Sequence, residues 1–259
     1  MSVPATSAAV RLAELLRSAD RVVGLTGAGI SVPSGIPDFR SPGTGLWANV
    51  DPMEVAHIAV FRREPERFWQ FYGDRFAMLR GKAPNGAHRA LVELERRGVL
   101  EAVVTQNIDG LHRAAGTEDL IEVHGTIGTS SCLSCGARYA LDDVRTRLAG
   151  AEDGVPRCDC GAPLKPDVVL FGELLPEPAL ARASELAANA DVLLCVGSSL
   201  EVFPVAQLPQ ITLAAGGAVA LVTQGPTPYD GRAAVKLSGD VEAELEALLA
   251  ALPAGRSGT

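Results

Sequence analysis

Short apolar runs alternate with longer amphipathic stretches along this chain, and the alternation is the strongest constraint on its fold. Four short runs are almost entirely apolar: 22–25, 102–105, 192–196 and 218–222. Four longer stretches have apolar residues at helical spacing: 5–18, 88–97, 176–188 and 241–252. A strand that is buried on both faces has such a continuous apolar sequence. The pattern therefore predicts an α/β fold with a Rossmann-like, doubly wound parallel sheet.

Two segments interrupt the alternation. Residues 43–84 carry most of the aromatic side chains and are expected to form a helical insert. Residues 130–164 hold cysteines among glycine and polar residues, too little apolar material to fold unaided. We expect these segments to form a smaller lobe, and residues 253–259 to be a loose tail. The nucleotide-binding domain would then be discontinuous, with residues 1–42, 85–129 and 165–252.

Composition and charge narrow the class of protein. The net charge of −8 disfavours a broad phosphate-binding surface, so nucleic acid is not an expected partner. No apolar run reaches the roughly 18 residues of a membrane span, and the first residues lack the features of a secretory signal. We therefore expect a cytoplasmic protein without a membrane partner.

Four of the five cysteines form two close pairs, Cys132 with Cys135 and Cys158 with Cys160. In a cytosolic chain, such pairs indicate a metal site more than disulfides, and four thiolates suit one tetrahedral Zn²⁺. Because four protein ligands leave no open coordination position, this zinc should be structural. The second pair has one intervening residue where two are usual, so its geometry is tighter. The fifth cysteine, Cys195, lies in an apolar run and is expected in the core.

The first apolar run leads into a glycine-rich loop that only partly matches a dinucleotide fingerprint. Gly27 and Gly29 fit the pattern G-x-G-x-x-G, but Val32 stands where the third glycine belongs. We expect backbone amides of this loop to bind pyrophosphate at a helix N-terminus. A dehydrogenase also needs an acidic residue at a second strand end, about 20 positions on. Asp51 has the spacing but does not end a strand, so hydride transfer is disfavoured.

A series of motifs occurs in an order that resembles the sirtuin family, from about residue 5 to residue 252. The motifs are GAGIS, SGIPDFR, TQNID, HG, the four cysteines, LKPDVVLFGE and GSSLEVFP. Sirtuins are NAD-dependent protein-lysine deacylases, in which a dinucleotide-binding lobe and a zinc-bearing lobe meet at a cleft. The resemblance implies the same here, with NAD consumed as a co-substrate and acylated lysine side chains of proteins as partners.

The resemblance assigns roles around the nicotinamide and its ribose. Asp109 and Ile108 would hold the carboxamide of nicotinamide. Gln106 and Asn107 would face the ribose from the end of a buried strand, a common place for ligands. His124 would be the general base, since imidazole titrates in a suitable range. The alternatives are a hydrogen-bonded turn at residues 105–109 and a structural role for the histidine.

Further residues are implied to bind NAD. Phe39 would shield the sugar cation from water and Arg40 would contact phosphate, the alternatives being packing and a surface charge. Thr223 and Gln224 depart from the family, because an Asn-led pair is common at their place near the adenine. The full set implied to bind NAD is Gly27, Ala28, Gly29, Val32, Asp38, Phe39, Arg40, Gln106, Ile108, Asp109, Gly197, Ser198, Ser199, Thr223, Gln224 and Val241.

The implied reaction transfers the acyl group to ADP-ribose. The acyl oxygen of the modified lysine attacks C1′ of the ribose as nicotinamide leaves. His124 then deprotonates a ribose hydroxyl, which attacks the resulting imidate, and water completes the release of lysine and O-acyl-ADP-ribose. Two alternatives stay open: mono-ADP-ribosyl transfer from the same pocket, and a zinc protein that senses NAD without turnover. His124 and Asn107 argue against the second, because binding alone needs no base.

Two segments are expected to meet the substrate. Residues 168–173 resemble the edge that pairs with an extended peptide, with Val169 and Phe171 lining the lysine tunnel. Tyr72 and Arg75 share one helix face, so they can point together into the cleft and bind a carboxylate. This Y-x-x-R resembles the pair by which one sirtuin branch accepts succinyl-lysine and malonyl-lysine. We expect activity on acetyl and dicarboxylic acyl groups, the alternative being a solvated Arg75 and a packed Tyr72.

Overall fold

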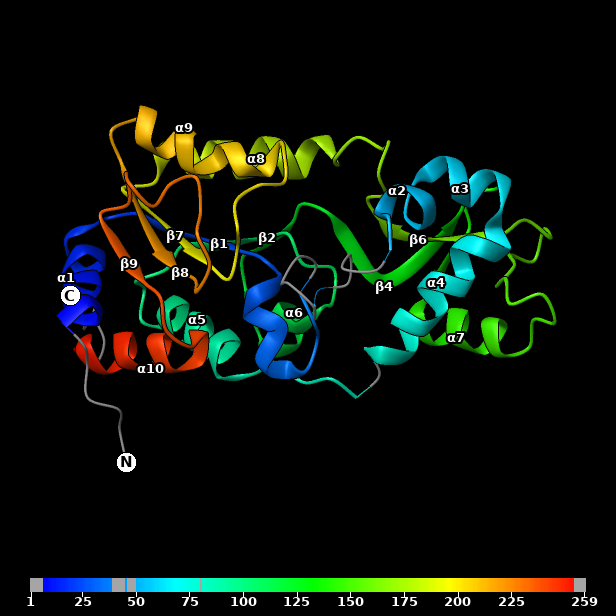
Figure 1. Ribbon diagram of the computed structural model, residues 1–259, viewed down its shortest axis with the longest axis horizontal. Coiled ribbons are helices and arrows are strands. Elements are labelled where there is room, and N and C mark those ends of the chain that lie inside the picture. Colours follow the sequence, from blue (N-terminus) through cyan, green and yellow to red (C-terminus); the bar gives the residue numbers. More distant parts are fainter. Residues whose placement is uncertain (1–6, 39–44, 46–49, 80, 254–259) are drawn as a thin grey trace.

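The computed structural model describes residues 7–38, 45, 50–79 and 81–253, with the backbone alone at 7 and 74–77, and these residues form two β-sheets. The larger sheet has six strands in the order β3-β2-β1-β7-β8-β9, and all of its strand pairs are parallel. The smaller sheet has three antiparallel strands in the order β5-β4-β6. Figure 1 shows the two sheets side by side along the long axis of the molecule. The α/β class expected from the sequence is confirmed.

The strands of the large sheet are short and mostly buried. They are β1 (Val22–Thr26), β2 (Ala102–Thr105), β3 (Leu120–Glu122), β7 (Val192–Val196), β8 (Ala218–Val222) and β9 (Val235–Leu237). The four strands expected from the apolar runs are confirmed as β1, β2, β7 and β8, the central strands of the sheet. The edge strands β3 and β9 were not expected, because three residues are too few to give a clear pattern.

The strand order reverses between β1 and β7. The chain builds outward from β1 to β2 and β3, and then returns to the other side of β1 to build β7, β8 and β9. The carboxyl ends of β1 and β7 therefore border a crevice of the kind where open α/β sheets bind ligands.

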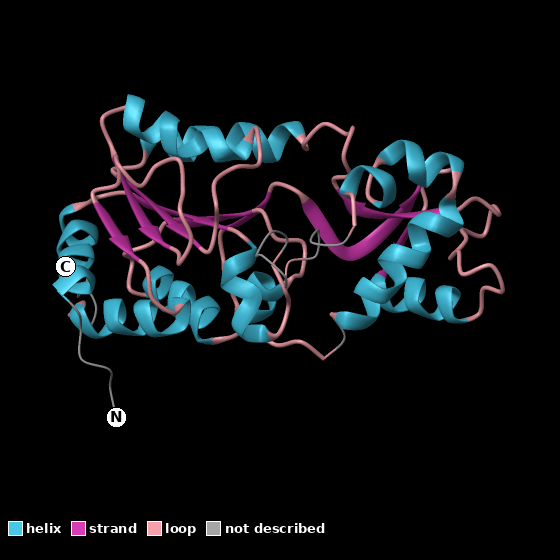
Figure 2. Cartoon of the chain, viewed as in Figure 1, coloured by secondary structure: helices cyan, strands magenta, loops and turns pink. Residues whose placement is uncertain are grey.

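Helices cover both faces of the large sheet (Figure 2). One face carries α1 (Ser7–Ser18), α5 (Gly86–Arg96) and α10 (Val241–Ala251), and the other carries α8 (Glu177–Asn189) and α9 (Leu208–Ala214). Alternate strand residues point to opposite faces of the sheet. Leu194 therefore packs with the first group of helices, and Leu193 packs with the second group. The four expected helices are confirmed as α1, α5, α8 and α10. No helix within the described residues is long and apolar enough to cross a membrane.

The small sheet packs against helices from both insertions. Its strands are β4 (Gly125–Cys132), β5 (Arg138–Ala140) and β6 (Leu164–Val168), and its helices are α2 (Pro52–Val55), α3 (Ile58–Arg63), α4 (Pro65–Met78) and α7 (Leu141–Ala149). One buried cluster joins helix and sheet, with Phe68 and Trp69 from α4 packed beside Leu164. The indole Nε1 of Trp69 also donates a hydrogen bond to the carbonyl oxygen of Leu164, at 2.9 Å. The two insertions therefore share one core.

The small sheet extends beyond the segment 130–164 expected for the zinc-binding module. β4 begins at Gly125 and β6 ends at Val168, and these two strands pair with each other. The chain thus leaves the large sheet directly after β3. The division into domains remains a proposal, and we propose boundaries near residues 124 and 169 for this module.

The turns after β1 and β7 pack backbone against backbone. The amide of Gly27 donates to the carbonyl oxygen of Val196 at 3.1 Å, and the amide of Gly29 to that of Gly197 at 2.8 Å. A Cβ on Gly29 would lie 2.8 Å from the Cα of Gly197, and a Cβ on Gly197 would lie 2.2 Å from the amide nitrogen of Ile30. These glycines are therefore required by the contact between two turns. The chain continues as a 3₁₀ helix, η1 (Ala28–Ser34), and the remaining short helices are α6 (Leu111–Ala115) and η2 (Val205–Gln207).

Replacing Gly197 with alanine tests this contact. Gly197 has a φ of +62° and no room for a side chain, whereas a Cβ on Gly216, which has a φ of +92°, would meet no atom of the described residues within 4 Å. We expect Gly197→Ala to lower the free energy of unfolding by about 3 kcal/mol or more. Gly216→Ala should lose only the roughly 1 to 2 kcal/mol of a left-handed backbone. Urea denaturation measures both, and equal losses would contradict the proposed close packing.

Candidate active site

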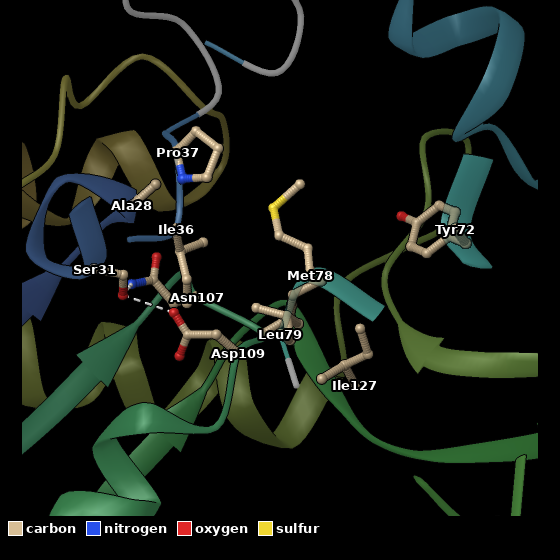
Figure 3. Close-up of a pocket in the computed structure, with 11 residues that line it drawn as sticks. Ala28, Ser31, Ile36, Pro37, Tyr72, Met78, Leu79, Asn107, Asp109 and Ile127 are labelled. Carbon is tan, nitrogen blue, oxygen red and sulfur yellow. Dashed lines mark hydrogen bonds between the residues drawn. The ribbon is translucent and has the colours of Figure 1, made fainter. Parts of the chain in front are cut away.

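A pocket opens at the carboxyl ends of the strands, beside the point where the strand order reverses. Its wall is formed by η1 and the residues after it, by the segment after β2, and by α4 and β4 of the small lobe. Figure 3 shows Asn107 and Asp109 on one side of the pocket and Tyr72 on the other. The lining residues are Ala28, Ser31, Ile36, Pro37, Tyr72, Met78, Leu79, Asn107, Ile108, Asp109 and Ile127.

Asp109 and Asn107 are held by hydrogen bonds to neighbouring loops. Oδ2 of Asp109 accepts from Oγ of Ser31 at 2.7 Å, and Oδ1 accepts from the amide of Leu111 at 2.9 Å. Nδ2 of the buried Asn107 donates to the carbonyl oxygen of Gly27 at 3.1 Å and to Oγ of Ser31 at 3.2 Å. These bonds orient the Asn107 amide and leave its Oδ1 without a partner among the described residues. Asn107 therefore presents a hydrogen-bond acceptor to a ligand.

Gln106 connects the ends of three strands. Its Nε2 donates to Oγ of Ser198 at 3.0 Å and to the carbonyl oxygen of Thr26 at 3.4 Å. Oγ of Ser198 also accepts from the amide of Leu200 at 3.2 Å. The segments after β1, β2 and β7, all implicated by the sequence, therefore meet in one place.

His124 stands where the chain crosses from the large sheet to the small one, between β3 and β4. Its Nδ1 lies 3.0 Å from the carbonyl oxygen of Gln106. Because a carbonyl only accepts, Nδ1 must carry the proton, and Nε2 of the neutral ring keeps its lone pair. Burial lowers the pKa of His124, although the hydrogen bond to Gln106 opposes this shift. The ring is therefore neutral near pH 7, with Nε2 able to accept a proton.

The glycine loop differs from the phosphate-binding loop that the sequence suggests. A helix N-terminus was expected at this loop, and the chain forms a 3₁₀ helix of seven residues that contains Pro33 and ends at Gly35 in the left-handed conformation. Two loop amides, those of Gly27 and Gly29, are bonded to the turn after β7. These two amides are thus occupied by the protein itself, which the sequence pattern could not indicate.

The remaining described residues implied to bind NAD do not line the pocket. Val32 is exposed in η1, and Asp38 is half-buried beyond it. Ser199 follows Ser198, while Thr223 and Gln224 follow β8 and become progressively exposed. Val241 begins α10 and is buried in the core of the large sheet. Phe39 and Arg40 lie outside the described residues.

Two buried histidines lie near the carboxyl ends of β1 and β2. Oγ1 of Thr26 donates to Oγ1 of Thr105 at 2.8 Å, so Nε2 of His112, at 2.9 Å from Thr26, must be the donor to it. His88 lies beside His112 with ring centroids 4.9 Å apart, and its Nδ1 accepts from the amide of Asn85 at 3.4 Å. Burial lowers the pKa of His112 to about 3 and that of His88 to about 4. Both rings are therefore neutral near pH 7, and each has one buried nitrogen without a partner among the described residues, Nε2 of His88 and Nδ1 of His112.

The expected substrate edge is joined to His124 through the backbone. The amide of Val169 donates to the carbonyl oxygen of His124 at 2.8 Å. Phe171 is 41% exposed, but its backbone pairs with residues 56–58 through the amide of Ile58 and the carbonyl oxygen of Ala56. One side of this segment is thus already paired within the chain. On the other side, the amide of Leu170 donates to Oε2 of Glu173 at 2.9 Å, and its carbonyl oxygen accepts from the amide of Glu173 at 3.0 Å.

Of the pair expected to choose the acyl group, only Tyr72 is described in full. Tyr72 lines the pocket while it is 6% exposed, and its ring stacks on Phe68 with centroids 4.4 Å apart. Tyr72 is therefore both packed in the core of the small lobe and adjacent to the pocket. The side chain of Arg75 lies outside the described part of the chain.

The four cysteines expected to bind zinc come together in the small lobe. Their sulfurs lie within 4.8 Å of one another, with Cys132 and Cys160 at 3.5 Å and Cys135 and Cys158 at 3.5 Å. Each close contact joins one pair to the other, and all four thiols are free of disulfides. Four sulfurs from two turns fit the tetrahedral set of a structural Zn²⁺.

Sequence reasoning missed six residues of the pocket wall. Ser31 lies within the GAGIS motif, so its link to Asp109 was within reach of motif analysis. Ile36 and Pro37 lie within the SGIPDFR motif. The proximity of the other three to the pocket depends on how the two lobes meet: Met78, Leu79 and Ile127.

Comparison with known proteins agrees with this geometry. The model of the Sir2 family matches residues 27–204. The NAD-dependent protein deacetylase of Sulfolobus acidocaldarius is 46% identical over 222 residues, which are 86% of this chain and 86% of that protein. A Sir2 structure with a deacetylated p53 peptide and 3′-O-acetyl ADP ribose is 40% identical, with a TM-score of 0.88 over 92% of this chain and 96% of that one. A second, of Sir2 with a p53 peptide and NAD⁺, is 39% identical, with a TM-score of 0.85 over the same shares. The chain therefore belongs to the Sir2 family.

Proposed function

We propose that this protein is an NAD-dependent protein-lysine deacylase that removes acetyl groups and forms nicotinamide, O-acyl-ADP-ribose and free lysine. The observation that supports this most is the tautomer of His124, whose Nε2 is a free proton acceptor at the junction of the two sheets. The names of the relatives, a protein deacetylase and Sir2 complexes with NAD⁺, acetyl ADP ribose and peptide, support the same activity.

We assign NAD to the crevice at the ends of β1, β2 and β7. Asp109, fixed by Ser31, and the neighbouring Ile108 hold the carboxamide of nicotinamide. Asn107 and Gln106 face the ribose, with the Oδ1 acceptor of Asn107 directed to the ligand. The four cysteines hold one structural Zn²⁺, which joins two turns of the small lobe and takes no part in the chemistry.

His124 is the general base in this proposal. Its Nδ1–H bond to Gln106 keeps Nε2 deprotonated, so Nε2 accepts the proton of a ribose hydroxyl as that hydroxyl attacks the acyl carbon. The bond from Val169 to the carbonyl oxygen of His124 ties the base to the segment that receives the peptide. Base and substrate edge therefore keep a constant relative position.

The cytoplasmic location expected from the sequence also remains a proposal.

Loss of His124 should abolish deacylation without loss of the fold. We expect His124→Ala to lower kcat for an acetyl-lysine peptide by about a hundredfold or more, the usual range of a general base. Mass spectrometry should detect O-acetyl-ADP-ribose only with the wild type, and thermal unfolding with zinc analysis checks that both proteins are folded. Nicotinamide release that is independent of any acylated peptide would favour mono-ADP-ribosyl transfer instead.

The pH dependence of the wild type follows from the burial of His124. The neutral imidazole is the active form, and burial lowers its pKa, so this form persists to lower pH than for an exposed histidine. We expect kcat to fall on the acid side with a midpoint below about 6.5, the ordinary histidine value. Steady-state rates from pH 5 to 8 measure this, and a midpoint above that value would contradict the assignment.

We also propose that the enzyme accepts succinyl-lysine and malonyl-lysine. The observation that favours this activity is the place of Tyr72, which lines the same pocket as Asn107 and Asp109. Arg75 follows one turn later on α4, so the helix brings both residues to one face. A phenol and a guanidinium together can bind the distal carboxylate of these acyl groups.

Arg75→Met tests the second activity, with Arg63→Met as the control. Arg63 lies on α3, and its side chain is 72% exposed with only a long contact to Glu64, at 3.9 Å. We expect Arg75→Met to lower kcat/KM for a succinyl peptide about ten- to a hundredfold, the value of a lost charged hydrogen bond. Its kcat/KM for an acetyl peptide should change by less than about threefold. Equal losses on both peptides would exclude a selective role.

A further inference from the structure

The two cysteine turns of the small lobe are built alike, although one is a residue shorter. In the first, the amide of Cys132 bonds to Ala137, and Gly136 follows the second cysteine with a φ of +75°. In the second, the amide of Cys158 bonds to Ala162, and Gly161 follows with a φ of +88°. The turn therefore accommodates one missing residue without losing its closing bond.

The missing residue removes one hydrogen bond to sulfur. In the longer turn, the backbone amides of Cys135 and Ser134 both lower the pKa of the Cys132 thiol. In the shorter turn, the amide of Cys160 is the one backbone donor among the groups that most affect the pKa of Cys158. Thiolates at a zinc site depend on such bonds, which spread their charge and fix their orientation. The shorter turn thus lacks one donor that the longer turn has.

The hydroxyl of Tyr139, on β5, lies beside the sulfur of Cys158 in the shorter turn. Its hydroxyl lies 3.3 Å from Sγ of Cys158, and its oxygen accepts from the amide of Asp159 at 3.2 Å. A thiolate bound to zinc has no proton, so the hydroxyl must donate to the sulfur. The amide of Asp159 is therefore connected to Cys158 through the phenol.

Arg147, on α7, holds this arrangement together. Its guanidinium lies 4.4 Å from the centre of the Tyr139 ring. The same group donates to Oδ1 of Asp159 at 2.7 Å and to the carbonyl oxygen of Arg157 at 2.9 Å. It thus contacts both the phenol and the two residues that flank Cys158 in sequence.

We propose that Tyr139 completes the zinc site by donating the hydrogen bond that the one-residue spacing between Cys158 and Cys160 removes, and that Arg147 positions Tyr139 for this role. Both are positioning residues, because the four sulfurs remain the ligands. The role concerns retention of the metal and does not depend on the proposed deacylase activity.

Zinc release from the full-length, zinc-loaded protein tests the proposal. A chromogenic chelator should remove zinc from Tyr139→Phe about tenfold faster than from the wild type, the lower range for loss of a group that supports a metal ligand. Tyr229→Phe is the matched control: its hydroxyl donates to the carbonyl oxygen of Ala206, in the large lobe. This control should release zinc at the wild-type rate. Equal rates for wild type and Tyr139→Phe overturn the proposal.

Two further measurements separate hydrogen bonding to sulfur from a general loss of stability. In Co²⁺-substituted protein, the sulfur-to-metal charge-transfer band should move to longer wavelength in Tyr139→Phe and stay in place in Tyr229→Phe. Inserting one serine after Asp159 restores a two-residue spacing, and in the Tyr139→Phe background it should return zinc release toward the wild-type rate. An unshifted band in Tyr139→Phe overturns the proposal, whether or not the insertion variant folds.

Discussion

The contact between the turns after β1 and β7 is the constraint on which the site depends. Gly29 and Gly197 meet backbone to backbone, so neither position has room for a side chain. This contact brings two strand ends together where the sheet reverses its order, and it positions Ser31, which in turn fixes Asp109 and Asn107. A pattern of glycines that suggests phosphate binding thus also serves to join two loops. Small residues are needed wherever backbones approach so closely.

The position of His124 between the two sheets determines its hydrogen-bond partners. β3 belongs to the large sheet and β4 to the small one, so the histidine between them contacts the strand-end segment at Gln106 and the proposed peptide segment at Val169. The backbone carbonyl of Gln106 determines that Nδ1 of His124 carries the proton. A side-chain substitution would not remove this carbonyl. The buried pair His88 and His112 differs, since each ring is neutral and bonded to the structure around it. The three histidines therefore differ in the partners that their ring nitrogens have.

The small lobe couples the cysteine cluster to the pocket through packing. Cys132 and Cys158 share a buried cluster with Trp69 and Tyr72 of α4. A lobe of this size has a limited core, so a metal that joins two turns adds stability that burial alone would not supply. Since Tyr72 lines the pocket, the order of the zinc site and the shape of the pocket are physically connected.

Local patterns in the sequence were enough to predict the central strands, four of the covering helices, the cluster of four cysteines and the polar segment at residues 105–109. They were enough because burial on two faces, helical spacing and ligand spacing are all properties of neighbouring residues. Tertiary structure alone decided which amides of the glycine loop are occupied, which nitrogen of His124 is protonated, and that Ile127 and Met78 reach the pocket. It also decided that Tyr139 faces Cys158. Each of these depends on a contact between residues far apart in the chain, and spacing along the sequence carries no information about such contacts.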